Sequence, residues 1–592
     1  MSSYTKGPHT FKAGVAFERI RNYEGEQGTY GGSFAFGRDA NNPFDSNYAY
    51  ANATLGNFAS YSESSARPSN EGRKSTVGWF VQDAWKINRK LTMDLGMRFA
   101  WFNQWYQNTL KASAWNAGLF DRAKIPTLYA PVSTAQGRRA VNPKTGEILP
   151  AVYIGAFVPN SGSPFNGAVT ADDKSYPRGF RDQAPVLYEP RIGLAYDPFG
   201  DGKTAIRTGF GIFHNTVSPG VRGFSQNPPT QQTPIVYYGS LSSYLNSSGV
   251  LFPNSTSTFE QKAVTPSMMN YTFGVQRDIG RGTVLEVSYV GNVGRHLQVS
   301  RNLNNVPYGA RYLPQNADPS NPATPLLDNF FRPYVGWANI TYNDFSSTSN
   351  YNSGQVTLNR RFAKGLSISG AYTYSKAMGY TDSDGDGVAA YRPIRIWNYG
   401  RLGFDQTHML VVNYIWDLPS GSRILPNAVG RMILDRWQIS GITTFASGQP
   451  AGVGFSTVDT VDLSGGGDGN RINVTGKAPY ERGERTFSKW FNTSVFARPA
   501  RGDFGNAPKD VFRLPGTANY DISFFKTIPL FSEKKSLQLR WEMYNAFNHT
   551  QFNSVDTTAR FDAQGNQVNT RFGEVTGARN PRRMQASLRF RF

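Results

Sequence analysis

The chain has 592 residues, no cysteine and a formal net charge of +20 at pH 7. The lack of cysteine excludes thiol catalysis, zinc–thiolate sites and a disulfide framework. The basic residues are scattered without a dense run, so the charge indicates polar faces and rims of a fold and not a nucleic-acid partner. With 60 Gly, 35 Pro and 14% aromatic residues, the composition favours strands and turns over helices.

No apolar run approaches the ~18 residues that a membrane helix needs. The alternation of apolar and polar residues that is typical of a strand opens the chain at 9–19. Weaker strand candidates follow at 31–36 and 58–64, on either side of an Asn-rich loop.

A strong hairpin covers 77–101 and turns at 88–90. Its first strand is apolar on one face except for Asp83, and its second strand alternates without a fault from Leu91 to Trp101. That second strand has the length of a tilted membrane-crossing strand, which needs ~9–11 residues. Pairs of such strands recur at 192–212, 271–289, 356–374, 410–445 and 520–547, and a single strand closes the chain at 584–592.

Short and long connections alternate along this series. Outer-membrane barrels have short periplasmic turns and long extracellular loops, and a soluble sandwich or propeller has no reason to keep that order. Trp and Tyr also gather near strand ends, where their rings favour the lipid headgroup level. The aromatic residues concerned are Trp101, Trp105, Tyr106, Trp416, Trp437, Trp541 and Tyr544.

The last nine residues form an amphipathic strand that runs to the terminal carboxylate. Such an end resembles the insertion signal that the barrel-assembly machinery reads in bacterial outer-membrane barrels. The residues of this expected barrel-insertion signal are Met584, Ala586, Leu588, Phe590 and Phe592.

One loop has the beginning of a calcium motif. Asp382, Asp384 and Asp386 stand at positions 1, 3 and 5 of an EF-hand-type loop and Gly387 at position 6, whereas position 12 is Pro393 and not the usual glutamate. We expect this loop to be the best calcium candidate, provided that another loop completes the ligand shell; a polar extracellular loop without metal is the other interpretation.

Motifs of catalysis are missing. The five histidines lie far apart, and neither an HExxH motif nor a GxSxG elbow occurs. Lys203 and its neighbours resemble the end of a phosphate-binding loop, but Asp197 stands where the first glycine of that loop belongs. We therefore expect no catalytic residue, no enzymatic activity and no cofactor other than calcium.

Three stretches resemble the TonB-dependent transporter barrels of the Oar-like group. They are WFVQDAWK at 79–86 with LTMDLGMRF at 91–99, PRIGLAYD at 190–197 with RTGFG at 207–211, and EMYNAFN at 542–548 with Phe552. The resemblance implies a barrel of about 22 strands, an N-terminal plug and a TonB-contacting segment. No plug, TonB-contacting segment or signal peptide can be matched in this sequence, so we expect residues 1–592 to be the C-terminal barrel portion of a longer protein.

The expected fold is therefore all-β: an antiparallel transmembrane outer-membrane β-barrel with about 14–16 strands present, an incomplete part of a ~22-strand barrel with long extracellular loops. Leu95 and Leu539 should face lipid, and Arg98 and Arg540 should face the lumen. The strands at 9–19 and 584–592 should form open or strained edges.

The expected function is that of an outer-membrane TonB-dependent receptor or transporter barrel of a Gram-negative envelope, which takes up an unidentified ligand. Expected partners are outer-membrane lipid and lipopolysaccharide, the barrel-assembly machinery, an extracellular ligand and, through a missing N-terminal region, the TonB complex. Two alternatives stay open: a non-transporting surface barrel for adhesion or envelope integrity, and a soluble secreted all-β protein that binds glycans with calcium.

Overall fold

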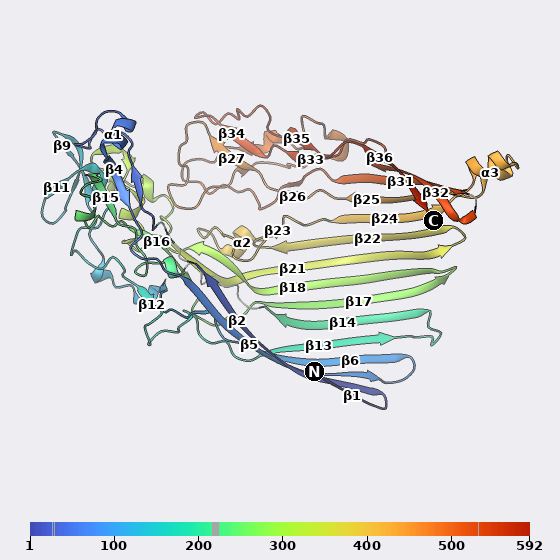
Figure 1. The fold of residues 1–592 in the computed structure, drawn as a ribbon. Helices are drawn as coiled ribbons and strands as arrows, with labels where there is room; N and C mark the ends of the chain where they lie inside the picture. Colours follow the sequence, from blue (N-terminus) through green and yellow to red (C-terminus); the bar gives the residue numbers. More distant parts are fainter. Residues whose placement is uncertain (26–27, 29, 216–223, 531) are drawn as a thin grey trace.

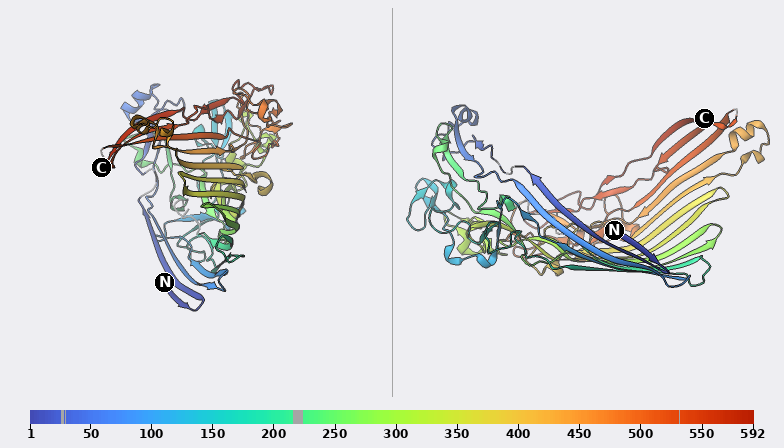
Figure 2. Two further views of the ribbon diagram at one scale, coloured as in Figure 1. Left: turned by 90° about the vertical axis from the view of Figure 1, so that its right-hand side faces the viewer. Right: turned by 60° about the horizontal axis from the view of Figure 1, so that its bottom comes forward.

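The computed structural model describes residues 1–25, 28, 30–215, 224–530 and 532–592. It is nearly all β-structure, dominated by one large sheet whose strands run side by side (Figure 1). The sheet curves around its long axis into an open trough, and the two ends of the chain lie on opposite rims of that trough (Figure 2).

Helices are few and short among the described residues. The α-helices are α1 (Ala49–Leu55), α2 (Ile394–Asn398) and α3 (Ala428–Leu434). None of the helices in the described part of the chain is long and apolar enough to cross a membrane.

The large sheet contains 18 strands, and fifteen of them follow one another as an antiparallel meander. In order across the sheet these are β1 (Ser2–Lys6), β2 (His9–Glu24), β5 (Asn70–Lys86), β6 (Leu91–Phe102), β13 (Leu187–Tyr196), β14 (Thr204–His214), β17 (Ser267–Gly280), β18 (Thr283–Asn302), β21 (Trp337–Ala363), β22 (Leu366–Gly379), β24 (His408–Asp417), β25 (Trp437–Ala446), β31 (Thr517–Leu530), β32 (Ser532–Tyr544) and β36 (Arg583–Arg591). The short strands β7 (Tyr106–Gln107), β16 (Asn254–Phe259) and β23 (Gly400–Arg401) complete it. The expected antiparallel sheet of about 14–16 long strands is confirmed, and in this structure it is not closed into a barrel.

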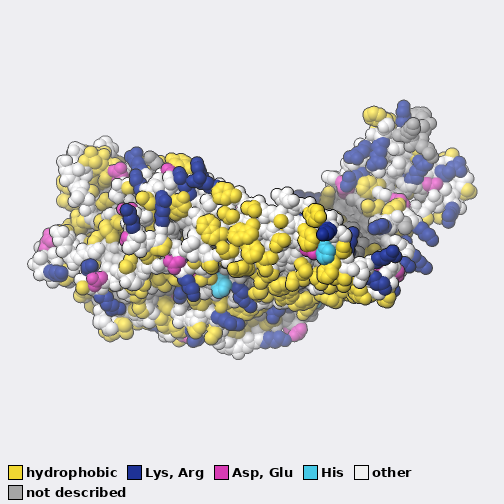
Figure 3. All heavy atoms as spheres, turned by 90° about the horizontal axis from the view of Figure 1, so that it is seen from below, with side chains coloured by type: hydrophobic (Ala, Val, Ile, Leu, Met, Phe, Trp, Pro, Cys, Tyr) yellow, Lys and Arg dark blue, Asp and Glu magenta, His cyan; other side chains and the backbone are white. Residues whose placement is uncertain are grey.

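The register places apolar side chains of neighbouring strands in continuous rows. Leu95 lies opposite Ile192, which lies opposite Phe210, and these three side chains are exposed. Directly opposed residues point to the same side of a sheet, so the row belongs to one face. Figure 3 shows hydrophobic side chains gathered on the underside of the sheet. An exposed apolar surface of this extent suits contact with lipid.

The other face carries the polar half of the alternation. Arg98 lies opposite Glu189, and Arg540 lies opposite Ser587. Leu539 lies opposite Leu588 on the apolar face. The predicted division of these residues between two faces is therefore confirmed.

Short and long connections alternate as predicted. At the short end, β17 turns into β18 through Arg281 and Gly282, and β21 turns into β22 through Lys364 and Gly365; all four residues have positive φ angles. Two-residue turns of this hand match the twist of the strands that they join. At the opposite end, connections such as 103–186 and 447–516 fold into separate small structures. One connection at the short end departs from the rule, because residues 418–436 form a 3-10 turn and helix α3.

One expectation about the start of the chain is confirmed and another is wrong. The strand candidates at 31–36 and 58–64 are the strands β3 (Ser33–Ala35) and β4 (Asn57–Ser62), which lie outside the large sheet: β3 pairs with β4, and β4 pairs with β15 (Ile235–Ser240) among the loops. The first edge of the large sheet is β1 and not the strand at 9–19. The β1 strand lacks apolar alternation, so its backbone pairing with β2 had no sequence signal.

Fully buried hydrophobic cores lie among the loops. One cluster contains Phe491, Phe512 and Phe561, and another contains Phe180, Phe224 and Phe345. Each cluster joins residues that are far apart in the sequence, and Phe345 contributes to the second cluster from the loop end of strand β21. The loops therefore have packed interiors of their own, which gives them a defined surface.

Candidate functional site

The C-terminal strand β36 places the predicted insertion residues on the apolar face. Met584 lies opposite Met543, Leu588 opposite Leu539 and Phe590 opposite Leu537. Ala586 lies opposite Trp541 on the same face, and Phe592 ends the chain 93% exposed. The amphipathic strand is confirmed, whereas its recognition by an assembly machinery stays a prediction.

Aromatic side chains mark the two ends of the strands. Trp416 and Trp437 border the connection at 418–436, and Trp101 lies at the loop end of β6. Trp416 and Trp541 are exposed on the apolar face and are not packed in a core. Their positions fit aromatic girdles at the two headgroup levels.

The polar face of the trough holds a chain of charged side chains. The buried carboxylate of Glu189 lies 3.4 Å from Arg98, 3.7 Å from Arg191 and 3.6 Å from His214. On a distant strand, Glu542 pairs with Arg540 and accepts a hydrogen bond from Gln585. A hollow of about 860 Å³ opens on this face near the loops, between β25, β31 and β36. Its polar lining includes Thr444, Asn519, Asp521, Gln551, Arg579 and Gln585.

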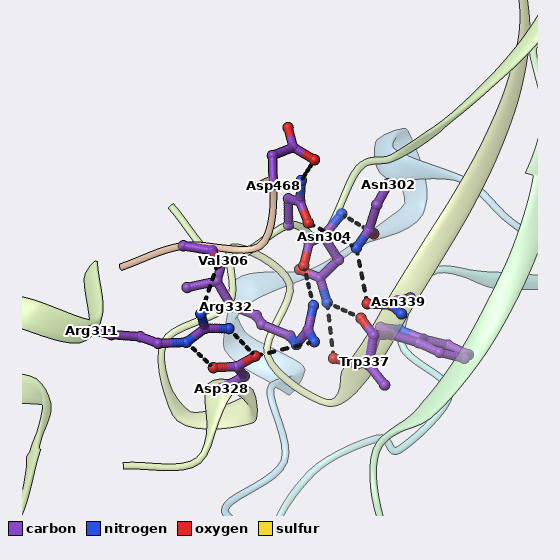
Figure 4. Close-up of polar contacts among 12 residues, drawn as sticks. Asn302, Asn304, Val306, Arg311, Asp328, Arg332, Trp337, Asn339 and Asp468 are labelled. Carbon is purple, nitrogen blue, oxygen red and sulfur yellow. Dashed lines mark hydrogen bonds and ion pairs between the residues drawn. The ribbon is translucent and has the colours of Figure 1, made fainter. Parts of the chain in front are cut away.

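Among the long loops, an arginine joins two connections of the sheet (Figure 4). The Nε and Nη2 groups of Arg311 donate to the two carboxylate oxygens of Asp328, both at 2.8 Å. Its Nη1 group donates to Asp462 at 2.7 Å, and Asp462 belongs to the connection at 447–516. The bidentate pair with Asp328 fixes the orientation of the guanidinium within its own loop, and the hydrogen bond to Asp462 then joins this loop to the second one.

A second acidic side chain joins three loops. The Oδ1 atom of Asp468 accepts from Asn305 Nδ2 at 2.7 Å, and its Oδ2 atom accepts from the Ala390 backbone N–H at 2.9 Å. Asn304 donates to the backbone carbonyls of Tyr334, Trp337 and Ala338, which holds its own loop in shape (Figure 4). We call the contacts of Arg311, Asp328, Asp462, Asp468 and Asn305 the loop lock.

A buried arginine supports the loops on the other side of the molecule. Arg181 donates to the backbone carbonyls of Glu260, Lys262 and Val264, and its guanidinium lies 4.1 Å from the ring centre of Phe345. Burial lowers the pKa of Arg181 to about 10, so it stays charged at neutral pH.

Breaking the loop lock should loosen the loops without unfolding the sheet. We expect Arg311→Met to lower the local stability of the loops by roughly 1–3 kcal/mol, because Asp462 loses its guanidinium partner and Asp328 keeps only the longer ion pair with Arg332 at 3.7 Å. Hydrogen exchange at 303–336 and 447–516 measures this effect. Arg122→Met, in an exposed loop position, is the matched control, and equal exchange in both variants would contradict the lock.

The loop lock should also weaken in acid. Burial raises the pKa of Asp462, but hydrogen bonds from Arg311 and the Gly465 backbone outweigh it and leave the pKa below the ordinary value of 3.8. A carboxyl with a lowered folded pKa stabilises the fold fully above its unfolded pKa and loses that contribution as the pH falls through the folded value. The protection of the loop amides, corrected for the intrinsic exchange rate at each pH, should therefore fall below about pH 4 in the native chain and change less in Arg311→Met.

The predicted calcium residues do not converge on a point. Asp382 accepts from the Gly403 backbone N–H at 2.8 Å and lies 3.8 Å from Lys509 Nζ, while Asp386 accepts from the Ser383 N–H at 3.0 Å. Burial and the nearby Asp386 raise the pKa of Asp384. Within the described ranges, no group of three or more acidic or histidine side chains could hold a metal ion.

Calcium binding at Asp382, Asp384 and Asp386 therefore stays a prediction. Calorimetry with millimolar calcium tests it: a heat that disappears in the double variant Asp384→Ala, Asp386→Ala is the expected sign of this site, and an unchanged heat would place any calcium elsewhere.

Sequence reasoning missed the loop lock and Arg181. The partners of Arg311 lie 17 and 151 residues away, and neither spacing belongs to a local motif. Arg181 donates only to backbone carbonyls, for which no side-chain pattern exists. The one available signal was the unusual length of the loops, since long loops in compact proteins are often functional.

Comparisons with known proteins agree with this architecture. A family model described as outer membrane beta barrel domain matches residues 1–585. The outer membrane transporter YddB from Escherichia coli is similar with a TM-score of 0.44 and 10% identity, over 96% of this chain and 50% of that chain. The FrpB iron transporter from Neisseria meningitidis is similar with a TM-score of 0.42 and 9% identity, over 99% of this chain and 52% of that chain. The ferric-catecholate import receptor Fiu from E. coli K12 is similar with a TM-score of 0.38 and 12% identity, over 99% of this chain and 52% of that chain.

The chain thus spans about half the length of these solved structures. No curated protein matches the chain. The family match extends over nearly all strands of the trough, including the apolar and polar faces described above. This chain therefore belongs to the outer membrane beta barrel domain family and is a protein of the outer membrane.

Proposed function

We propose that the chain forms the barrel of an outer-membrane receptor that takes up a ligand from outside the cell by TonB-dependent transport. The observation that carries the proposal is the combination of a polar trough with a locked loop assembly above one end of it. The ligand would bind to the loops and pass along the polar face. Its chemical identity is left open.

The loops suit capture because they are folded before a ligand arrives. Internal phenylalanine clusters and the Arg311 ion pairs fix their shapes. A preformed surface loses less conformational freedom on binding than a flexible one. The hollow lined by Asn519, Asp521 and Arg579 then offers hydrogen-bond donors and acceptors on the way into the trough.

In such a receptor, a plug, proteins of the envelope and lipids would act together with the barrel. A plug would fill the trough and contact the TonB complex, and the assembly machinery would read the strand that ends in Phe592. Lipopolysaccharide and phospholipid would cover the apolar face. No covalent chemistry is part of this function.

Labelling of single cysteines in the native outer membrane tests the route. The chain has no cysteine, so each introduced thiol is unique. Ser288 lies opposite Gln355 on the polar face, and its neighbour Val287 lies opposite Val356 on the apolar face. We expect a water-soluble maleimide to react with the Ser288→Cys chain and to spare the matched Val287→Cys chain.

Dissipating the proton-motive force separates the candidate functions. In an energised receptor, a protonophore should change the labelling rate of Ser288→Cys severalfold, because the occupant of the trough no longer moves. An unchanged rate would favour the non-transporting surface barrel. Equal labelling of both variants would contradict the assignment of the two faces.

A further inference from the structure

The connection at 418–436 carries an unusual cluster of exposed apolar side chains. It joins β24 to β25 and projects beyond the strand ends as helix α3 (Figure 1). Ile424 is 87% exposed, and none of the apolar residues of this connection belongs to a buried hydrophobic cluster of the described chain. The exposed apolar residues are Ile424, Leu425, Val429, Met432, Ile433 and Leu434.

The end of α3 is fixed against the lipid-facing side of the sheet. The indole N–H of Trp437 donates to the Ile433 carbonyl at 2.8 Å, and the ammonium of Lys526 donates to the Asp435 carbonyl. Trp437 lies opposite Lys526, which lies opposite Leu539 on the apolar face. The apolar cluster is therefore continuous with the surface that contacts lipid.

The connection has a defined shape and a basic charge. Asn427 caps α3 by accepting from the Gly430 N–H at 2.7 Å, and Asp435 accepts from the backbone N–H and hydroxyl of Ser422 at 2.9 and 2.8 Å. These bonds occupy the one carboxylate of the segment. Three exposed arginines remain for other partners: Arg423, Arg431 and Arg436.

A hollow adjoins the connection on the apolar face. It has a volume of about 540 Å³ and is lined chiefly by hydrophobic side chains around Lys526. The lining includes Trp437, Phe524, Leu539, Trp541 and Leu588. An apolar hollow with one ammonium at its border fits an acyl chain whose phosphate lies at the membrane surface.

We propose that residues 418–436 form an interfacial anchor that inserts into the periplasmic leaflet and binds an anionic glycerophospholipid. The apolar side chains of α3 enter the leaflet, the arginines contact the phosphate, and an acyl chain lies in the hollow beside Trp437. Apolar side chains combined with basic ones are typical of segments that lie in a membrane interface. Periplasmic turns of outer-membrane barrels are usually short. The connection at 418–436 is longer than such a turn, and we assign the additional residues a function of their own.

Fluorescence depth measurements test the insertion. The full chain carrying Ile433→Cys is labelled with an environment-sensitive dye and reconstituted in phosphatidylcholine vesicles with or without phosphatidylglycerol. We expect a blue-shifted emission that spin-labelled lipid quenches. The matched control is Leu245→Cys, an exposed apolar position in an extracellular loop, whose dye should stay in water. An Ile433 dye that remains in water would overturn the proposal. A blue-shifted emission that spin-labelled lipid does not quench would overturn it as well, since a second copy would then cover the helix.

Charge reversal tests the headgroup preference. With quenching by spin-labelled phosphatidylglycerol relative to phosphatidylcholine as the readout, Arg431→Glu should reduce the preference by about fivefold or more, since each arginine near an anionic surface contributes about 1 kcal/mol. Arg122→Glu, an exposed position in an extracellular loop, should leave the preference unchanged. Equal quenching by both lipids in the native chain would overturn the anionic-lipid assignment, and both measurements are independent of ligand transport.

Discussion

Leu358→Arg should destabilise the membrane-embedded sheet by roughly 2–4 kcal/mol, the cost of a basic side chain on the lipid face near the bilayer midplane. Leu358 is exposed on the apolar face, opposite Leu285 and Gly370. It lies a few residues before the turn that ends β21 (Trp337–Ala363), and this distance is about half of the ~9–11 residues that cross the hydrocarbon layer. The free energy of unfolding from vesicles, followed by denaturant titration, measures the loss.

The neighbouring residue provides the control. Thr357 lies opposite Glu286 on the polar face, so Thr357→Arg should cost little, because its guanidinium meets water and a carboxylate. The loss of stability caused by Leu539→Arg should lie between those of the other two variants. Leu539 is near the interface, because it lies opposite Lys526, whose ammonium donates to the carbonyl of Asp435 in the periplasmic connection. Arginine costs less near an interface than at the midplane. Equal losses for Leu358→Arg and Thr357→Arg would disprove the division into two faces.

The strands that form the wall of the trough were predictable because the pattern that defines them involves only neighbouring residues in the sequence. A strand that faces lipid on one side and a polar space on the other must alternate residue by residue, and β6 does so from Leu91 to Trp101. The alternation of connection lengths then fixed the direction of each strand. Asp83, which breaks this pattern on the apolar face, has a structural explanation: its carboxylate lies 2.7 Å from His9 Nδ1 on the adjacent strand, beside the ring of Trp85. A charged group that faces lipid needs such a partner.

The loops were not predictable because their contacts are distant in sequence. Arg311 meets Asp462 only after four further long strands of the wall, β21, β22, β24 and β25, and Asp468 meets Asn305 and Ala390 from a third loop. Strands β3 and β4 carry the same short alternation as a wall strand but pair with each other, and β4 pairs with β15, among the loops. Alternation indicates that a strand exists and does not say which sheet it joins.

Helix α3, at the other end of the strands, could not be predicted from the sequence either. The alternation of short and long connections predicts a short connection after Trp416, and Pro419 and Gly421 are residues typical of turns. The apolar residues that follow have neither the strict alternation of a strand nor the length of a stable isolated helix. Bonds from Trp437 and Lys526 hold the helix in place, and both come from later parts of the chain.

The largest expected effect concerns the edges of the trough. Among the described residues β1 pairs only with β2 and β36 only with β32, so the expectation of open edges is confirmed for the C-terminal strand and moves from 9–19 to β1 at the other rim. Backbone groups in hydrocarbon must be paired, and an unpaired strand edge there costs several kcal/mol per group. Residues 1–592 alone should therefore fail to form a stable, uniform pore in single-channel recording after refolding.

Crosslinking in the cysteine-free chain gives a direct readout of closure. Ser3→Cys combined with Arg589→Cys places one thiol on each edge strand, and we expect no intramolecular crosslink from the isolated chain. The control combines Gln538→Cys with Arg589→Cys, which are directly opposed in β32 and β36 and should crosslink readily. A crosslink between the edge strands together with uniform channels would mean that the fifteen-strand meander closes by itself. If the edge thiols instead react only when further strands are supplied, by a longer chain or a second copy, the trough is part of a larger barrel, because only added strands can satisfy the edge groups of β1 and β36.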